Sequence, residues 1–307
     1  MKGPEKEYRA QMLEAQLMAF HNERIPLIGI IPVENLLSFI AQLIDSIQRV
    51  EYVYTIRRRP ISPLRAEPTS ELFDPIRAAI LLAARGQQEE AFWLIFLATH
   101  CGHNLRTHWL LARELYGAYE NAPWTWDRVS DNPAIYSEWI EDNRIHFQGK
   151  FGNHRKYESL RQGGRGTGTV IKTYVRWIET YGSHSQMIAN ALSLANGDPR
   201  QAFALLYESM GSVLSFGRTG RFDYLTMLSK AGLAAIDANS TYLSEATGPK
   251  KGARLLFDGQ IASKTGVKIL EARVEALEKH LGVGMQVMED AMCNWQKSPG
   301  EYVPFRG

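Results

Sequence analysis

The segment DPIRAAILLAARG (residues 74–86) carries the signals of a complete helix. Asp74 is a favoured N-cap residue, Pro75 suits the first helical position, and Gly86 ends the apolar run. Helical apolar spacing recurs along most of the chain, at residues 7–21, 35–49, 89–99, 107–116, 132–142, 169–181, 183–196, 199–209, 222–230, 266–281 and 282–296. We therefore predict a mainly α-helical, multi-helix globular fold, with at most a minor β element in the alternating residues 51–57.

The composition is that of an ordinary globular protein. The chain has 307 residues, of which 45% are hydrophobic and 22% charged, so disordered and collagen-like classes are excluded. The longest apolar stretches, such as residues 78–84 and 92–98, are too short to cross a bilayer, and MKGPEKEYRAQ lacks the core of a signal peptide. Two cysteines, Cys101 and Cys293, cannot form a disulfide scaffold. We expect a reducing cytoplasm and no membrane association.

Positive charge is concentrated in a few segments, although the net charge is only +2. Residues 147–176 contain seven basic residues and a single acidic one, Glu158, and residues 52–66 contain four arginines and no acid. This pattern indicates a polyanion-binding face, with DNA or RNA favoured over a set of solvated loops. Six glycines lie among the charges at residues 143–168, which we predict to be an exposed, basic, glycine-rich functional loop.

The segment GGRGTGTVIKTYVRW (residues 163–177) is suited to phosphate contact. Glycines allow a backbone to approach a ligand, and the following helix offers free N–H groups. The segment lacks the GK[ST] ending of a Walker loop, and no parallel strand precedes it as in a Rossmann fingerprint. Nucleic-acid backbone is therefore the expected phosphate source, and a plain surface turn is the alternative. The candidate DNA-binding residues are Arg106, Arg155, Lys156, Arg165, Thr167 and Lys172.

The segment SFGRTGRFDYLTMLSK (residues 215–230) places Arg218 and Arg221 one short turn apart, where two guanidiniums can clamp a phosphoryl group. Asp223 lies beside them. The alternative is an ordinary helix start in which Asp223 pairs with an arginine. The segment TGPKKGARL (residues 247–255) is a second basic, glycine-containing element, and its alternative is a solvated turn.

Two further segments contain residues capable of proton transfer or metal binding. In GVGMQVMEDAMCNWQKSP (residues 282–299), Glu289 and Asp290 are candidate bases, and a structural salt bridge is the alternative. HCGHNLRTHW (residues 100–109) has three histidines and Cys101 at a spacing that matches no familiar metal site. We therefore expect no metal and interpret this segment as a helix–turn with polar side chains facing DNA.

Four segments together resemble the alpha-glutamyl/putrescinyl thymine pyrophosphorylase family, the amino acid:DNA transferases of phages with hypermodified thymine. They are FWLIFLATHCGHNLRTHWLLARELYG (92–117), SVLSFGRTGRFDYLTML (212–228), ATGPKKGARLLF (246–257) and LGVGMQVMEDAMCNWQKSP (281–299). The resemblance runs from about Asp74 to Gly307. It implies an N-terminal helical region at residues 1–73 and a transferase domain at residues 74–307, which could also form one continuous unit.

The resemblance implies a post-replicative reaction on double-stranded DNA in the cytoplasm of an infected bacterial host. A separate DNA kinase first phosphorylates 5-hydroxymethyluracil, and the transferase replaces the phosphate (or pyrophosphate) by an amine. Glycine as donor, as in the glycine-transferring type of Pseudomonas phages, gives 5-Nα-glycinylthymidine; other members use glutamate or putrescine. A free amino acid is the co-substrate, and no cofactor is expected.

This reaction assigns roles to the motif residues. The target base is expected to flip out of the duplex, and its stacking candidates are Phe216, Tyr224 and Trp295, each with core packing as the alternative. The candidates for stabilising the leaving phosphate are Arg218, Arg221, Lys250, Lys251 and Arg254. The candidates for the base are Asp223, Glu289 and Asp290, and Cys293 (or Cys101) could add to the pyrimidine ring as a nucleophile. The competing functions are a helical base-flipping DNA glycosylase or lyase and a non-catalytic DNA-binding protein.

Overall fold

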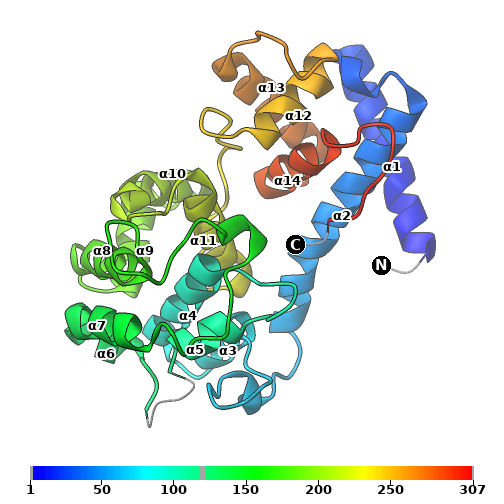
Figure 1. The fold of residues 1–307 in the computed structure, drawn as a ribbon. Coiled ribbons are helices and arrows are strands. Elements are labelled where there is room, and N and C mark those ends of the chain that lie inside the picture. The colour runs from blue at the N-terminus through cyan, green and yellow to red at the C-terminus, as the bar shows by residue number, and fades with distance from the viewer. Residues whose placement is uncertain (1–2, 118–121, 306–307) are drawn as a thin grey trace. The chain divides into compact units, whose positions relative to one another are not determined.

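A computed structural model describes residues 3–117 and 122–305 (Figure 1). These ranges contain fourteen α-helices, four short 3-10 turns and no β-strand, which confirms the predicted mainly α-helical fold. The helices are α1 (Gly3–Glu23), α2 (Val33–Arg57), α3 (Pro75–Ala84), α4 (Gln88–Cys101), α5 (Leu110–Leu115), α6 (Trp126–Asp131), α7 (Pro133–Asn143), α8 (Thr167–Glu179), α9 (His184–Leu194), α10 (Pro199–Ser209), α11 (Arg218–Ala231), α12 (Gly248–Asp258), α13 (Val267–Leu281) and α14 (Met285–Trp295). None of these helices is long and apolar enough to cross a membrane.

Helix ends follow local chemistry at several places. The side chain of Asp74 accepts hydrogen bonds from the backbone N–H groups of Ile76 and Arg77, and Pro75 occupies the first turn of α3 as predicted. Asp198 caps α10 in the same way. Short polar side chains at these positions satisfy N–H groups that have no partner within the helix.

One prediction of local structure is wrong. The expected strand at residues 51–57 is the last part of α2, where Val53 and Ile56 are buried three positions apart, a helical spacing that a short alternating run hides. The solvated turn that was the alternative for TGPKKGARL is not found. This segment forms the beginning of α12, whose Gly252 lies so close to α14 that a Cβ there would stand 2.3 Å from the carbonyl oxygen of Met292.

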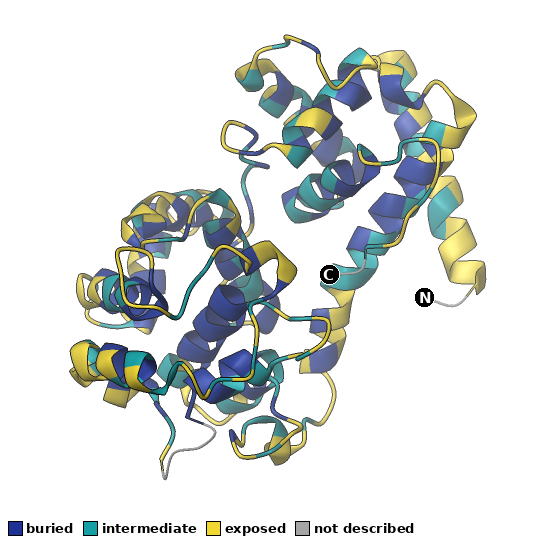
Figure 2. Ribbon diagram, viewed as in Figure 1, coloured by how far each residue is buried: buried dark blue, intermediate teal, exposed yellow. Residues whose placement is uncertain are grey.

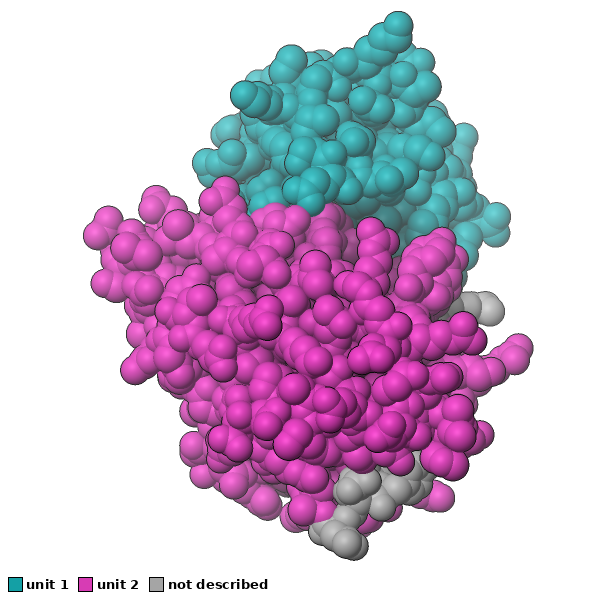
Figure 3. All heavy atoms as spheres, turned by 60° about the vertical axis from the view of Figure 1, so that its left-hand side comes forward, with its two compact units in different colours: residues 1–53, 238–306 teal, residues 54–237, 307 magenta. Residues whose placement is uncertain are grey.

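The chain divides into two compact units (Figure 3). Unit 1 combines residues 1–53 with residues 238–306, so both ends of the sequence contribute to it. Unit 2 is formed by residues 54–237. The chain passes from unit 1 to unit 2 within α2. A functional boundary between residues 73 and 74 stays a prediction.

Each unit has its own apolar core (Figure 2). In unit 1, α1 buries Leu13, Leu17 and Phe20, and α12 packs against α14. In unit 2, the central helix is α4, in which every residue from 91 to 101 is buried. A helix that is apolar around its whole circumference must be surrounded by other elements. Helices α3, α5, α6, α9 and α11 all contact α4.

Candidate functional site

Unit 2 contains an open pocket of about 460 Å³ in the predicted glycine-rich segment. We call it the basic pocket. Its lining residues are Arg144, Gly149, Lys150, Phe151, Lys156, Glu158, Ser159, Leu160 and Arg161. Four of these carry a positive charge, and Glu158 is the one carboxylate among them. The volume lies in the range of small-molecule sites, and the charge favours an anionic ligand.

The backbone of this segment is held in place by side chains of α5 and of the residues just before it. Glu114 is fully buried, and its two carboxylate oxygens accept hydrogen bonds from the backbone N–H groups of Gln148 (2.9 Å) and Gly149 (2.8 Å). The Oγ1 of Thr107 accepts another from the N–H of Lys150 at 3.2 Å. The rim of the basic pocket is therefore anchored to the core of unit 2.

The glycines of the segment have two different functions. A Cβ at Gly149 would stand 2.2 Å from the backbone nitrogen of Leu111, so the close approach of the two backbones needs glycine. A Cβ at Gly168 would meet the hydroxyl of Ser137 at the same distance. At Gly164, by contrast, a Cβ would meet nothing within 4 Å. Some glycines of this segment are thus required by close packing, whereas others, such as Gly164, lie where a side chain would fit.

The aromatic wall of the basic pocket continues into the core. Phe151 meets the buried ring of His100 edge-on, with ring centroids 5.7 Å apart. His100 Nε2 lies 3.0 Å from the Oγ1 of Thr167, which donates its own proton to the carbonyl of Ser159. His100 must therefore be the donor to Thr167. Burial, with the charge of Arg155 nearby, lowers the pKa of His100 to about 3, so the imidazole is neutral.

Three residues predicted to have separate roles meet beside His100. Arg155 is buried, and its Nη2 donates to the Oδ2 of Asp223 at 2.9 Å while its Nε donates to the carbonyl of Thr99 at 2.8 Å. The same guanidinium lies 5.9 Å from the ring centroid of Phe216, which stacks on His100. Asp223 thus pairs with an arginine, as the alternative to the phosphate clamp stated, and this arginine is Arg155.

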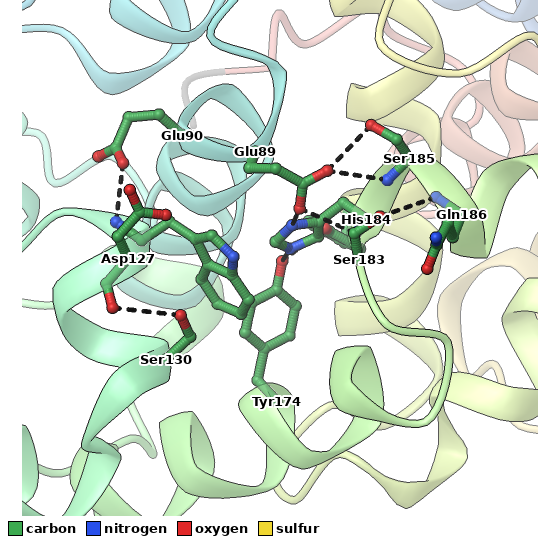
Figure 4. Close-up of polar contacts among 11 residues, drawn as sticks. Glu89, Glu90, Asp127, Ser130, Tyr174, Ser183, His184, Ser185 and Gln186 are labelled. Atoms are coloured by element: carbon green, nitrogen blue, oxygen red, sulfur yellow. Dashed lines mark hydrogen bonds and ion pairs between the residues drawn. The ribbon is translucent and has the colours of Figure 1, made fainter.

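A second polar network lies in unit 2, and Figure 4 shows its part around Tyr174, His184 and Glu89. The hydroxyl of Tyr224 is 2.8 Å from that of Tyr174, which is 2.6 Å from the Nε2 of His184. The Nδ1 of His184 is 2.6 Å from Glu89. Although burial opposes ionisation, the hydrogen bonds and charge of His184 lower the pKa of Glu89 to about 2. Tyr224, a stacking candidate, is fully buried within this network.

A family model described as alpha-glutamyl/putrescinyl thymine pyrophosphorylase clade 3 matches residues 34–307. The chain belongs to this family. No curated protein and no solved structure matches. The expected resemblance is confirmed. The match begins earlier than residue 74, since it includes α2 from residue 34 onward.

The other candidate residues of unit 2 in this pyrophosphorylase-family chain differ in exposure and in contacts. Lys156 lines the basic pocket, while Arg106 and Arg165 are exposed and Lys172 is half-buried on α8. The two candidate clamp residues lie over different rings. The guanidinium of Arg218 is 5.1 Å from the ring centroid of Phe222, and that of Arg221 is 4.2 Å from the ring centroid of Tyr207. Burial raises the pKa of the Cys101 thiol, which keeps it protonated.

The remaining candidates of this family member lie in unit 1. Lys250, Lys251 and Arg254 are on α12, and Glu289, Asp290, Cys293 and Trp295 are on α14. Asp290 forms a salt bridge with Arg49 and accepts hydrogen bonds from Ser46 (2.8 Å) and Asn294 (2.9 Å). Trp295 is fully buried and donates its indole N–H to the Oγ of Ser38 at 3.0 Å. Asp290 therefore has the contacts of a structural salt bridge, and Trp295 has those of a core residue, as the alternatives for these residues stated.

Several residues of the site were not singled out by sequence reasoning. Glu89 and His184 are 95 positions apart, so no local spacing connects them. Glu158 appears in the sequence analysis only as the single acidic residue among the basic residues 147–176. Its position among these charges is the one sequence feature that distinguishes it. Among the described residues, no group of three or more His, Cys, Asp and Glu side chains is placed to hold a metal ion.

Proposed function

We propose that this protein is a phage DNA-modifying transferase that replaces the phosphate (or pyrophosphate) of 5-phosphomethyl-deoxyuridine in double-stranded DNA by an amine. The family match over residues 34–307 is the observation that carries the proposal. The family name describes thymine bearing an alpha-glutamyl or putrescinyl group, and both groups can be joined to the base through an amine nitrogen. We propose glycine as the donor, with 5-Nα-glycinylthymidine as the product.

The basic pocket supports a substrate that carries a phosphate. Arg144, Lys150, Lys156 and Arg161 line it, and fixed cations stabilise the charge that grows on a departing phosphate. Phe151 supplies an aromatic wall against which an extruded pyrimidine can stack. Flipping a base costs a few kcal/mol, and stacking and phosphate contacts partly offset this cost. The anchored backbone keeps the cations in place before the substrate arrives.

The proposal also defines the biological setting. The substrate is duplex DNA whose 5-hydroxymethyluracil has already been phosphorylated by a separate kinase, and the co-substrate is a free amino acid. The phosphate on the base supplies the leaving group, so the reaction needs no further cofactor. We place the reaction in the cytoplasm of the infected bacterial host.

The test is a product analysis. The protein is incubated with a duplex containing 5-phosphomethyluracil and with glycine, glutamate or putrescine, and the digested nucleosides are measured by mass spectrometry. We expect a glycine adduct together with one equivalent of free phosphate. An abasic site would instead support a base-flipping glycosylase, and unchanged nucleosides with a shifted duplex in a gel would support a non-catalytic DNA-binding protein.

A further inference from the structure

Glu158 occupies an unusual position in the basic pocket. It is the one carboxylate among the lining residues, and the charges of Arg155 and Arg165 also act on it. Its Oε2 atom is buried and, within the part of the chain that the structure describes, accepts no hydrogen bond. A buried acceptor without a donor is costly, and such atoms are rare outside places where a ligand or water supplies the donor.

Glu158 also contacts Ser215, a residue with a strained backbone conformation. The side chain of Ser215 forms a hydrogen bond with the carboxylate of Glu158. Ser215 has φ of +59°, in the left-handed region that residues with a side chain seldom adopt. It directly precedes Phe216, which stacks on His100. Strain of this kind persists only where the surroundings impose it, and it is concentrated at functional sites.

We propose that Glu158 is the general base that removes a proton from the incoming amine. The inference rests on the proposed function and adds a catalytic residue to it. A free amino acid carries an ammonium group at neutral pH, and the nitrogen cannot attack until one proton has left. The ammonium is the donor that the unpaired Oε2 lacks, and the Glu158 side chain must turn to present this buried atom to the cavity that it lines.

Burial raises the pKa of Glu158 above that of an exposed glutamate, against the opposing effects of Ser215, Arg155 and Arg165. A carboxylate with a raised pKa is a stronger base than an ordinary one. Asp223, the candidate base on α11, already accepts a hydrogen bond from the buried Arg155 and does not line the basic pocket.

The step is balanced in atoms and charge. The ammonium transfers one proton to the Glu158 carboxylate, and the freed nitrogen lone pair forms a bond with the methylene carbon on the base. The bond between this carbon and the phosphate oxygen breaks, and its electron pair leaves with the phosphate. The proton on Glu158 then passes to the departing phosphate. The products are a secondary ammonium on the base and hydrogen phosphate, and Glu158 is again ionised.

The experiment compares Glu158→Gln with the wild-type protein and with Glu179→Gln, which alters an exposed carboxylate at the end of α8. Adduct formation and affinity for the phosphorylated duplex are measured for each. Because general bases contribute about 100-fold to 10,000-fold, we expect Glu158→Gln to lower turnover by about 100-fold or more while its duplex affinity stays within a few-fold of wild type. Glu179→Gln should turn over normally.

A second variant separates catalysis from structure. In Glu158→Ala, added formate can occupy the vacated space and accept the proton, so we expect turnover to rise with formate concentration. A merely structural carboxylate would not be rescued in this way. Turnover of Glu158→Gln near the wild-type rate, or a Glu158→Ala protein that formate does not rescue, would overturn the assignment.

The two proposals fail in different ways. If the wild-type protein forms no adduct with any amine, the proposed function is wrong and the role of Glu158 is rejected with it. If the wild-type protein forms the adduct and Glu158→Gln does so equally well, only the role of Glu158 is rejected.

Discussion

His100 makes the stability of unit 2 depend on pH in a way that can be calculated. The imidazole is buried and neutral, with a pKa of about 3, whereas the same group in the unfolded chain titrates near the ordinary value of 6.5. Because the folded pKa is depressed, the unfolded state binds the proton first, and stability is lost as the pH falls below 6.5. Between pH 7 and pH 5 this loss amounts to about 2 kcal/mol, from 1.36 kcal/mol for each pH unit below 6.5.

The measurement is urea unfolding of the wild-type protein and of His100→Gln at several pH values between 7 and 5. Glutamine preserves a hydrogen-bond donor toward Thr167 and removes the titration. Other titrating groups, including His184, are common to both proteins and cancel in the difference. We expect the variant to be less stable at pH 7, because packing against Phe96 and Phe216 is lost, and the gap to narrow by about 2 kcal/mol by pH 5. A gap of constant size would refute the reasoning.

Three further predictions concern the basic pocket and its support. Gly149→Ala should lower the free energy of unfolding by about 1–3 kcal/mol, because the new Cβ meets backbone, whereas Gly164→Ala should change it by less than about 0.5 kcal/mol; both are read from thermal unfolding. Glu114→Gln should lower the free energy of unfolding by about 2 kcal/mol in denaturant titrations, because an amide cannot accept both backbone hydrogen bonds. Lys156→Ala and Arg161→Ala should each reduce the slope of log affinity against log salt for duplex DNA by about 0.9 if the residue contacts a phosphate, and an unchanged slope would remove it from the interface.

The helices were predictable where local chemistry decides them. Helix α3 begins and ends as its N-cap, proline and glycine indicated, since each of these residues acts on its own segment. The end of α2 was mistaken for a strand, because seven residues cannot distinguish a twofold from a helical repeat without the buried positions that precede them. The start of α12 is also not predicted from the sequence, because its residues are basic and include glycines. One of these, Gly252, allows α12 to pack closely against α14.

The candidate site was only partly predictable, because its contacts join distant positions. The charge pattern located the segment that forms the basic pocket, but the pairing of Arg155 with Asp223 spans 68 positions and depends on the packing of α4 against α11. Charge alone also could not distinguish a buried arginine from an exposed one. Arg155 and Lys156 are neighbours in sequence, yet the first is enclosed by protein and the second lines the cavity.

The division of the chain has a consequence for its synthesis on the ribosome. Unit 2 is one continuous stretch, whereas the apolar face that α1 presents to α13 has no partner until residues 267–281 have been made. The nascent amino-terminal helices therefore wait through the translation of more than two hundred codons before the ring of Phe20 meets that of His280 in α13. The core of unit 1 can therefore be completed only after unit 2 has been translated, and apolar surface exposed in the meantime favours aggregation.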